Sequence, residues 1–188
     1  MNNHEEEYEK ARGRVNCKML SKVEREEMVL STFRIIGYDE EIPGLIAQNK
    51  FETADKLILF LHGLGGKKED SLAFRIFLRD FEFSIMAIDA RGHGERKKDF
   101  MSLQPETMVS YWNKTIVDNR LAIDIAFRNG WVKEGKLILA GVSMGGILGG
   151  VVAGVDKRVS GTILYVPGGD LAEVISNSTI GRSIPLST

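Results

Sequence analysis

A serine bracketed by glycines follows an apolar run in the second half of the chain. The segment 141–145, GVSMG, has the spacing G-x-S-x-G and lies between an expected strand and an expected helix. In that context the spacing is typical of a sharp, strained turn that exposes the serine Oγ above the ends of the strands. Gly141 and Gly145 suit this turn because strand and helix approach each other closely there. We predict that Ser143 is a nucleophile and that the backbone N–H of Met144, at the helix N-terminus, stabilises an oxyanion.

A glycine-rich turn, HGLGG, occupies residues 62–66 directly after the apolar run LILFL. Such a turn can direct a backbone N–H, which we expect to be that of Leu64, into the same cleft as a second oxyanion donor. Glycine-rich turns after strands also bind phosphate groups. The spacing argues against phosphate here, because no Ser or Thr follows Lys67 and because Lys68 occupies the position of the last glycine in G-x-G-x-x-G.

Short apolar runs alternate with amphipathic patterns along most of the chain, and this alternation predicts an α/β fold. We expect one domain with a mostly parallel sheet and helices on both of its faces. The expected strands lie within 28–37, 43–49, 56–63, 83–94, 136–141 and 159–170, and the expected helices cover 71–81, 105–129 and 144–155. The expected divisions are a charged N-terminal helix or arm (1–27), the core (28–170) and a tail (171–188).

Composition narrows the range of partners and compartments. A net charge of −1 gives no reason to expect nucleic acid or an anionic membrane as a partner. The only cysteine, Cys17, excludes an internal disulfide and favours a reducing, cytoplasmic compartment. The first residues, MNNHEEEYEKARGR, lack the apolar region of a secretory signal.

One uncharged run around the serine allows a second interpretation, a membrane-spanning helix in place of a strand, a turn and a helix. Residues 137–155 include no charge over nineteen positions, which is close to the length of a membrane-spanning helix. They also contain G-x-x-x-G spacings, which suit packed membrane helices. Six glycines within the run would each weaken a continuous helix by about 1 kcal/mol relative to alanine. Dividing the run at Ser143 continues the alternation on either side, so we expect no membrane span.

Three glycine-containing segments end three successive expected strands: HGLGG, DARGHGER (89–96) and GVSMGG. As a set and in this order they resemble the α/β-hydrolase superfamily, particularly its esterases, lipases and serine-peptidase-like members, over roughly residues 30–170. The resemblance implies a three-layer sandwich with strand order 1-2-4-3-5-6-7-8, of which about six strands are present. It further implies a carboxylic ester hydrolase with a Ser…Asp…His triad, a small-molecule acyl substrate, and no cofactor or metal. It assigns Ser143 as nucleophile, Leu64 and Met144 to the oxyanion hole, and His62, Gly63, Gly65, His93, Gly141 and Gly145 to the supporting loops.

The triad that the resemblance implies is incomplete in this sequence. The family's acid usually follows the seventh strand and its histidine the eighth, whereas GTILYV corresponds to the sixth strand. All three histidines, His4, His62 and His93, precede Ser143. The resemblance gives His62 a structural role in the oxyanion turn and places His93 in a loop at the edge of the cleft. Asp170 is a weak candidate for the acid, and a turn or cap residue is its alternative interpretation.

Two interpretations of the chain follow, from different classes of protein. In the first, it is an N-terminal portion of a longer hydrolase, its tail begins a cap segment, and it is nearly inactive alone. In the second, it is a complete, non-catalytic α/β-hydrolase-like binding protein, or a subunit whose histidine comes from another chain. In both, the apolar strand TILYV would form an exposed edge that favours self-association.

Overall fold

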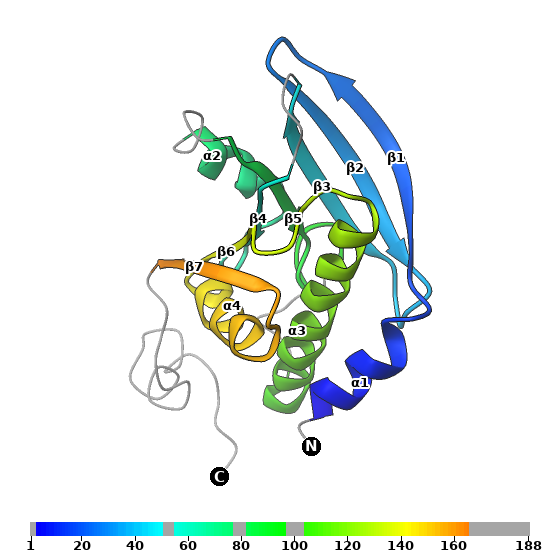
Figure 1. Ribbon diagram of the computed structural model, residues 1–188. Coiled ribbons are helices and arrows are strands. Elements are labelled where there is room, and N and C mark those ends of the chain that lie inside the picture. Colours follow the sequence, from blue (N-terminus) through cyan, green and yellow to red (C-terminus); the bar gives the residue numbers. More distant parts are fainter. Residues whose placement is uncertain (1–2, 51–54, 77–81, 97–103, 166–188) are drawn as a thin grey trace.

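A seven-stranded mixed sheet with helices on both faces forms the described part of the protein (Figure 1). The computed structural model describes residues 3–50, 55–76, 82–96 and 104–165. The strands are β1 (Asn16–Glu24), β2 (Met28–Ile36), β3 (Ile42–Asn49), β4 (Leu57–Leu61), β5 (Ser84–Ile88), β6 (Leu137–Val142) and β7 (Val159–Tyr165). The helices are α1 (Asn3–Ala11), α2 (Asp70–Ile76), α3 (Pro105–Arg128) and α4 (Met144–Val155), with a short 3-10 turn, η1 (Gly94–Arg96). The α/β class predicted from the sequence is confirmed.

The order of the strands sets the position of the site. The sheet runs β1-β2-β3-β5-β4-β6-β7. The last four of these strands are parallel to one another, whereas β1, β2 and β3 extend the sheet from β5 in antiparallel fashion. From β2 onward, this is the order 1-2-4-3-5-6 that the resemblance implies. Leu61 at the end of β4 is the register partner of Gly141 in β6, so the segments that follow these two strands begin side by side.

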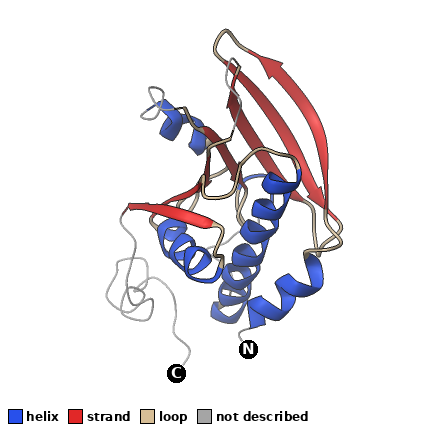
Figure 2. Cartoon of the chain, in the orientation of Figure 1, coloured by secondary structure: helices blue, strands red, loops and turns tan. Residues whose placement is uncertain are grey.

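The side chains of the central strands point alternately into two cores, as expected for strands buried on both faces. Leu59 and Met86 belong to the larger core, on the side of α3 and α4. Ile58 and Ile85 belong to the smaller core, against which Phe74 of α2 packs. Figure 2 shows the helices on the two sides of the sheet. The sheet therefore forms the middle layer and holds the loops at its ends in fixed positions.

The uncharged run 137–155 forms β6 and α4 and is divided at Ser143, as predicted. Across the described ranges, we find no helix with the length and apolarity needed to cross a membrane.

The N-terminal segment is only partly helical, and this changes the number of strands. We predicted about six strands and a charged helix or arm over residues 1–27, whereas α1 ends at Ala11 and β1 follows as a seventh strand. The prediction rests on apolar residues at roughly helical spacing, Tyr8, Ala11, Val15, Met19 and Val23. The first three are buried, but Met19 on β1 is 49% exposed. β1 pairs with β2 in antiparallel fashion, and a charged strand is well tolerated at the edge of a sheet. The division at residue 27 stays a prediction.

A buried tyrosine fastens α1 to the rest of the fold. The Tyr8 hydroxyl donates to Asp124 Oδ1 at 2.9 Å and accepts from Arg158 Nη2 at 3.0 Å. The Arg120 guanidinium lies over the Tyr8 ring, with Cζ 3.6 Å from the ring centroid, a favourable cation–π contact. Burial and the neighbouring Asp124 raise the pKa of Tyr8 to about 12. These contacts join α1 to α3 and to the residues just before β7.

We expect Tyr8→Phe to lower the free energy of unfolding by about 1–3 kcal/mol, because it removes a buried hydroxyl that bonds two charged groups. The neutral form of Tyr8 is favoured in the fold, so its contribution is complete below pH 10 and is lost as the pH rises through about 12. Urea titrations of wild type and Tyr8→Phe at pH 7 and above pH 10 measure the free energy of unfolding of each protein. The difference in this free energy between the two proteins should be smaller at high pH. Tyr165→Phe, at a 67% exposed tyrosine, is the control. Equal stability of Tyr8→Phe and wild type at pH 7 would show that the hydrogen bonds of the Tyr8 hydroxyl do not stabilise the fold.

Candidate active site

Ser143 occupies a strained backbone conformation at the junction of β6 and α4. Its φ is 52° and its ψ is −117°, and it is the one non-glycine residue with positive φ in the described part of the chain. A non-glycine residue in such a conformation costs about 1–3 kcal/mol, and such residues cluster at functional sites. The side chain is exposed. The junction therefore presents the serine hydroxyl to solvent at the end of the parallel strands.

The glycines around Ser143 are required by close backbone packing. A Cβ on Gly141 would lie 2.3 Å from the carbonyl oxygen of Gly145. A Cβ on Gly145 would lie 2.1 Å from the carbonyl oxygen of Leu61 and 2.6 Å from that of His62. Since real Cβ atoms do not approach backbone so closely, only glycine fits at both positions. Three backbone segments, the ends of β4 and β6 and the start of α4, thus converge at this point.

The HGLGG turn lies against the serine. A Cβ on Gly63 would be 3.7 Å from Ser143 Cβ and 3.4 Å from the Val142 carbonyl oxygen. The turn is closed by a hydrogen bond of 3.0 Å from Gly66 N–H to the Gly63 carbonyl, and Gly65 adopts a φ of 75° that favours glycine. The half-buried Leu64 packs against the larger core. The structure therefore brings the turn that carries Leu64 next to the start of α4, which carries Met144.

His62 connects this turn to the loop after β5. The Ala90 N–H donates to His62 Nε2 at 3.1 Å, and His62 Nδ1 lies 2.8 Å from the Gly63 carbonyl oxygen. Because Nε2 accepts a hydrogen bond, the proton of the neutral ring is on Nδ1, which donates to Gly63. Burial lowers the pKa of His62, although the Gly63 carbonyl acts in the opposite direction. Both ring nitrogens are thus engaged in holding the backbone.

His93 lies in the loop after β5, beside His62. The centroids of the two rings are 5.3 Å apart, and His93 Nδ1 is 2.8 Å from the Arg91 carbonyl oxygen. Gly94 has a φ of 54°, and a Cβ there would lie 2.2 Å from the Asp89 carboxylate. The two histidines predicted to support the site are therefore brought together.

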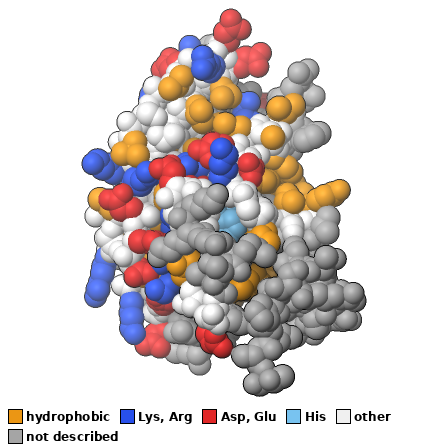
Figure 3. All heavy atoms as spheres, turned by 180° about the vertical axis from the view of Figure 1, so that it is seen from behind, with side chains coloured by type: hydrophobic (Ala, Val, Ile, Leu, Met, Phe, Trp, Pro, Cys, Tyr) orange, Lys and Arg blue, Asp and Glu red, His pale blue; other side chains and the backbone are white. Residues whose placement is uncertain are grey.

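A buried lysine and aspartate join the HGLGG turn to the loop after β5. Lys68 Nζ donates to Asp89 Oδ2 at 3.0 Å, to Glu69 Oε1 at 3.0 Å and to Glu95 Oε1 at 2.6 Å. Glu95 also pairs with Arg34 of β2. Arg34 and Lys68 lower the pKa of Glu95 to about 2. Charged side chains of both signs lie next to one another across the middle of the face in Figure 3.

A second ionic cluster holds the loop after β5 against α3. The Asp118 carboxylate, in α3, accepts from Arg91 Nε at 3.0 Å and from Arg96 Nη1 at 2.8 Å. Arg91 Nη1 also donates to Asp39 at 2.6 Å, and Arg96 Nε donates to Glu40 at 3.0 Å. Neither cluster was predicted from the sequence. The available signal was the charge density of DARGHGER directly after a buried strand, where charges must pair with partners.

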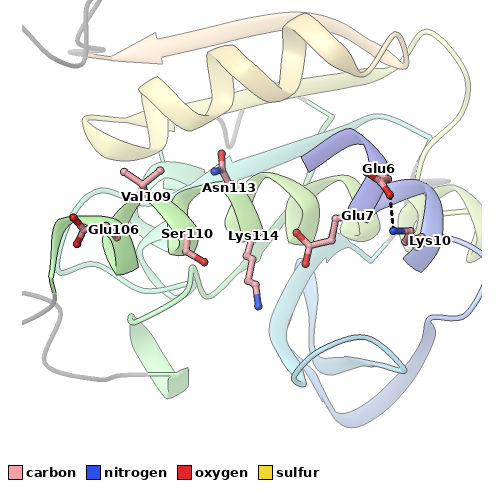
Figure 4. Close-up of a pocket in the computed structure, with 8 residues that line it drawn as sticks. All are labelled: Glu6, Glu7, Lys10, Glu106, Val109, Ser110, Asn113 and Lys114. Carbon is pink, nitrogen blue, oxygen red and sulfur yellow. Dashed lines mark hydrogen bonds and ion pairs between the residues drawn. The ribbon is translucent and has the colours of Figure 1, made fainter. Parts of the chain in front are cut away.

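A small cavity lies behind the junction of β6 and α4, and a larger groove lies away from it. A cavity of about 10 Å³ behind the junction is bordered by His62, Asn119 and Met144 among others, which is room for about one water molecule. A larger groove lies between α1 and α3, where Lys10 pairs with Glu6 (Figure 4). Its lining comes from those two helices and not from the segments around Ser143.

The predicted incompleteness of the triad is not tested by the described residues. His4, the first of the three histidines that precede Ser143, lies in α1, which packs on α3. Asp170, the weak candidate for the acid, lies outside the described residues, as does the predicted tail 171–188. The absence of a triad acid and base from their family positions therefore stays a prediction.

The strand order, the strained serine between β6 and α4, and the glycine turn beside it define an α/β-hydrolase. Residues 52–180 match the serine aminopeptidase (S33) family, and the chain belongs to this family.

Sequence relatives and solved structures agree with an α/β-hydrolase fold. Over 108 residues, 55% of this chain and 41% of the relative, the sequence is 31% identical to YitV of Bacillus subtilis (strain 168), whose name places it among the esterases. A cold-adapted esterase from an Arctic intertidal metagenomic library is 25% identical and has a TM-score of 0.61, over 76% of this chain and 62% of that one. The fold also matches an acetyl xylan esterase from Paenibacillus sp. R4 (TM-score 0.74, 19% identity, 88% and 57% covered). The chain spans less than two thirds of the length of each of these relatives.

We expect Gly145→Ala to destabilise the protein by about 3 kcal/mol or more, because the new methyl group meets backbone atoms that cannot move aside. Gly154→Ala, in the same helix, is the matched control. A Cβ there meets nothing within 4 Å, so this change should stabilise by about 0.5–1 kcal/mol. Thermal and urea unfolding of both variants measure the contrast. Similar stabilities for the two variants would show that the close approach at Gly145 is not a constraint.

Proposed function

We propose that this chain carries the nucleophile and the oxyanion hole of a carboxylic ester hydrolase that acts on a small-molecule acyl substrate. The observation that carries the proposal is the strained backbone of Ser143, with the HGLGG turn packed directly against it. The strain has no other evident role, and it aims the hydroxyl to the side where a substrate can approach. The relatives named as esterases support an ester rather than a peptide bond.

The reaction would proceed by acyl transfer through Ser143. The Oγ atom bonds to the ester carbonyl carbon, and the carbonyl oxygen becomes an oxyanion that accepts hydrogen bonds from the N–H groups of Leu64 and Met144. Collapse of this intermediate breaks the bond to the alcohol, whose oxygen takes up the proton that Oγ has lost. Water then hydrolyses the acyl-serine to the carboxylic acid and the free serine. Two preorganised donors in a site of this kind contribute about 10²–10³ in rate each.

Proton transfer requires a base that the proposal does not assign within the described residues. His62 is unsuited to that role because Ala90 donates to its Nε2 and its Nδ1 proton is directed to the Gly63 carbonyl. A serine without a base reacts slowly, and only the oxyanion donors assist it. We therefore propose that residues 1–188 alone hydrolyse esters well below the usual enzyme rate of about 10 s⁻¹.

Labelling with a fluorophosphonate and hydrolysis of p-nitrophenyl acetate test this proposal. We expect slow covalent labelling of one residue, Ser143, identified by peptide mass spectrometry, together with weak ester hydrolysis that Ser143→Ala abolishes. Ser110→Ala, at an exposed serine of α3, is the control and should behave as wild type. Equal labelling of wild type and Ser143→Ala would refute the proposal that Ser143 is the nucleophile. Turnover near 10 s⁻¹ that depends on Ser143 would refute the proposal that residues 1–188 lack a base.

We also propose that the edge of β7, which has no partner strand among the described residues, pairs with a second copy of the chain. The seven residues of β7, VSGTILY, include no charge, and Ile163 and Tyr165 are 44% and 67% exposed. β1, the other edge strand of the described sheet, contains Lys18 and Lys22 and has an irregular register near Leu20. Lysines and bulges discourage edge pairing, so only β7 suits an uncharged, self-complementary contact.

Sedimentation velocity across a concentration series tests the β7 edge. We expect wild type to associate as its concentration rises and Ile163→Lys to remain monomeric, because a charge placed on an edge strand opposes pairing. Leu20→Lys on β1 is the matched control and should associate like wild type. Association that survives Ile163→Lys would place the contact elsewhere.

A further inference from the structure

The HGLGG turn is fastened at both ends to two consecutive residues of the loop after β5. At its start, His62 Nε2 accepts from Ala90 N–H at 3.1 Å. At its end, Lys68 N–H donates to Asp89 Oδ1 at 2.8 Å and Lys68 Nζ donates to Asp89 Oδ2 at 3.0 Å. The five residues between these anchors include Leu64, whose N–H is the proposed second oxyanion donor.

Asp89 is a fully buried acceptor that receives three hydrogen bonds, from donors in both loops. Besides the two bonds from Lys68, its Oδ2 accepts from Glu95 N–H at 3.0 Å, and its exposed fraction is 0%. The carboxylate also fills the space that a Cβ of Gly94 would need. Its position is therefore determined from several directions, and it can in turn determine the position of Lys68.

Lys68 is an unusual residue to bury beside a surface turn. Its side chain is 3% exposed, and burial of an ammonium group costs several kcal/mol before any pairing. Burial lowers the pKa of Lys68, but the carboxylates of Glu95, Glu69 and Asp89 outweigh this and raise the pKa overall, so the group stays charged. An apolar pair of similar size would often stabilise a protein at least as well as a buried ion pair. Stability alone therefore does not account for this pair.

We propose that Lys68 and Asp89 are positioning residues for the oxyanion hole. Together they hold the end of the HGLGG turn so that the Leu64 N–H faces the oxyanion formed at Ser143. The inference rests on the proposed function, but the geometry it predicts can be measured without catalysis. Neither residue touches the substrate; each acts through the backbone of the turn.

Amide signals of the full chain test the geometric part. In Lys68→Met we expect hydrogen exchange at Gly66, whose N–H closes the turn on the Gly63 carbonyl, to accelerate at least tenfold, while exchange at Leu59 and Met86 in the core stays within twofold of wild type. Lys67→Met is the matched control, since Lys67 is the exposed neighbour, and should match wild type at all three amides. Unchanged exchange at Gly66 in folded Lys68→Met would overturn the proposal.

Asp89→Asn provides a second variant if Lys68→Met folds poorly. The amide has one acceptor oxygen in place of two and directs an N–H₂ group at donors, so it should loosen the turn with little change in side-chain volume. We expect the same selective acceleration at Gly66. A folded Asp89→Asn protein with wild-type exchange at this amide would also overturn the proposal.

The labelling rate of Ser143 separates positioning from stability. We expect the second-order rate constant for fluorophosphonate labelling to fall at least tenfold in Lys68→Met, as expected when one oxyanion donor is misplaced. Tyr8→Phe, which is destabilised at a position away from the turn, is the control for stability and should be labelled at the wild-type rate. An equal fall in the labelling rate of both variants would show that lost stability alone slows labelling and would overturn the proposal. If wild type is not labelled at Ser143, the proposed function fails, and the exchange measurements still decide whether Lys68 and Asp89 hold the turn.

Discussion

The rest of the site depends on one constraint, the contact of three backbone segments at Gly145. The Leu61 carbonyl, the end of β6 and the first turn of α4 meet where no Cβ can be accommodated. This contact follows from the sheet, because β4 and β6 are parallel neighbours with Leu61 opposite Gly141. It forces the chain to reverse within one residue, and that residue, Ser143, bears the strained conformation. The surrounding packing must supply the free energy that this strain costs.

Much of this arrangement could be predicted from the sequence, because it depends on local patterns. The alternation of apolar runs and amphipathic segments predicts β4 to β7 and α3 and α4, and glycine spacing predicts the turn at Ser143. β1 was wrongly predicted as part of a helix or arm, because apolar residues every three or four positions continue from α1 through Met19. In the structure Met19 is exposed on an edge strand, where pairing with β2 decides the conformation and periodicity does not.

The ionic clusters could not be predicted because their partners are distant in the sequence. Lys68 meets Asp89 across 21 residues, and Arg96 meets Glu40 across 56. A single sequence shows that these residues are charged but not that the sheet order brings them together. Burial of such charges is tolerated only when every charge has a partner. The ion pairs can therefore be predicted only once the order of the strands in the sheet is known.

The three loops that build the site are held by three different physical devices. Close backbone packing fixes the turn at Ser143, a neutral histidine and a buried ion pair fix the HGLGG turn, and arginine–carboxylate contacts fix the loop after β5 on α3. All three act before any substrate binds, which is the condition for stabilising an oxyanion without reorganisation during the reaction. Proton transfer has a different requirement, because a base must change its protonation state within hydrogen-bond reach of Oγ. His62 holds the backbone in place before a substrate binds because both of its ring nitrogens are engaged in hydrogen bonds. For the same reason it does not meet the requirement for a base.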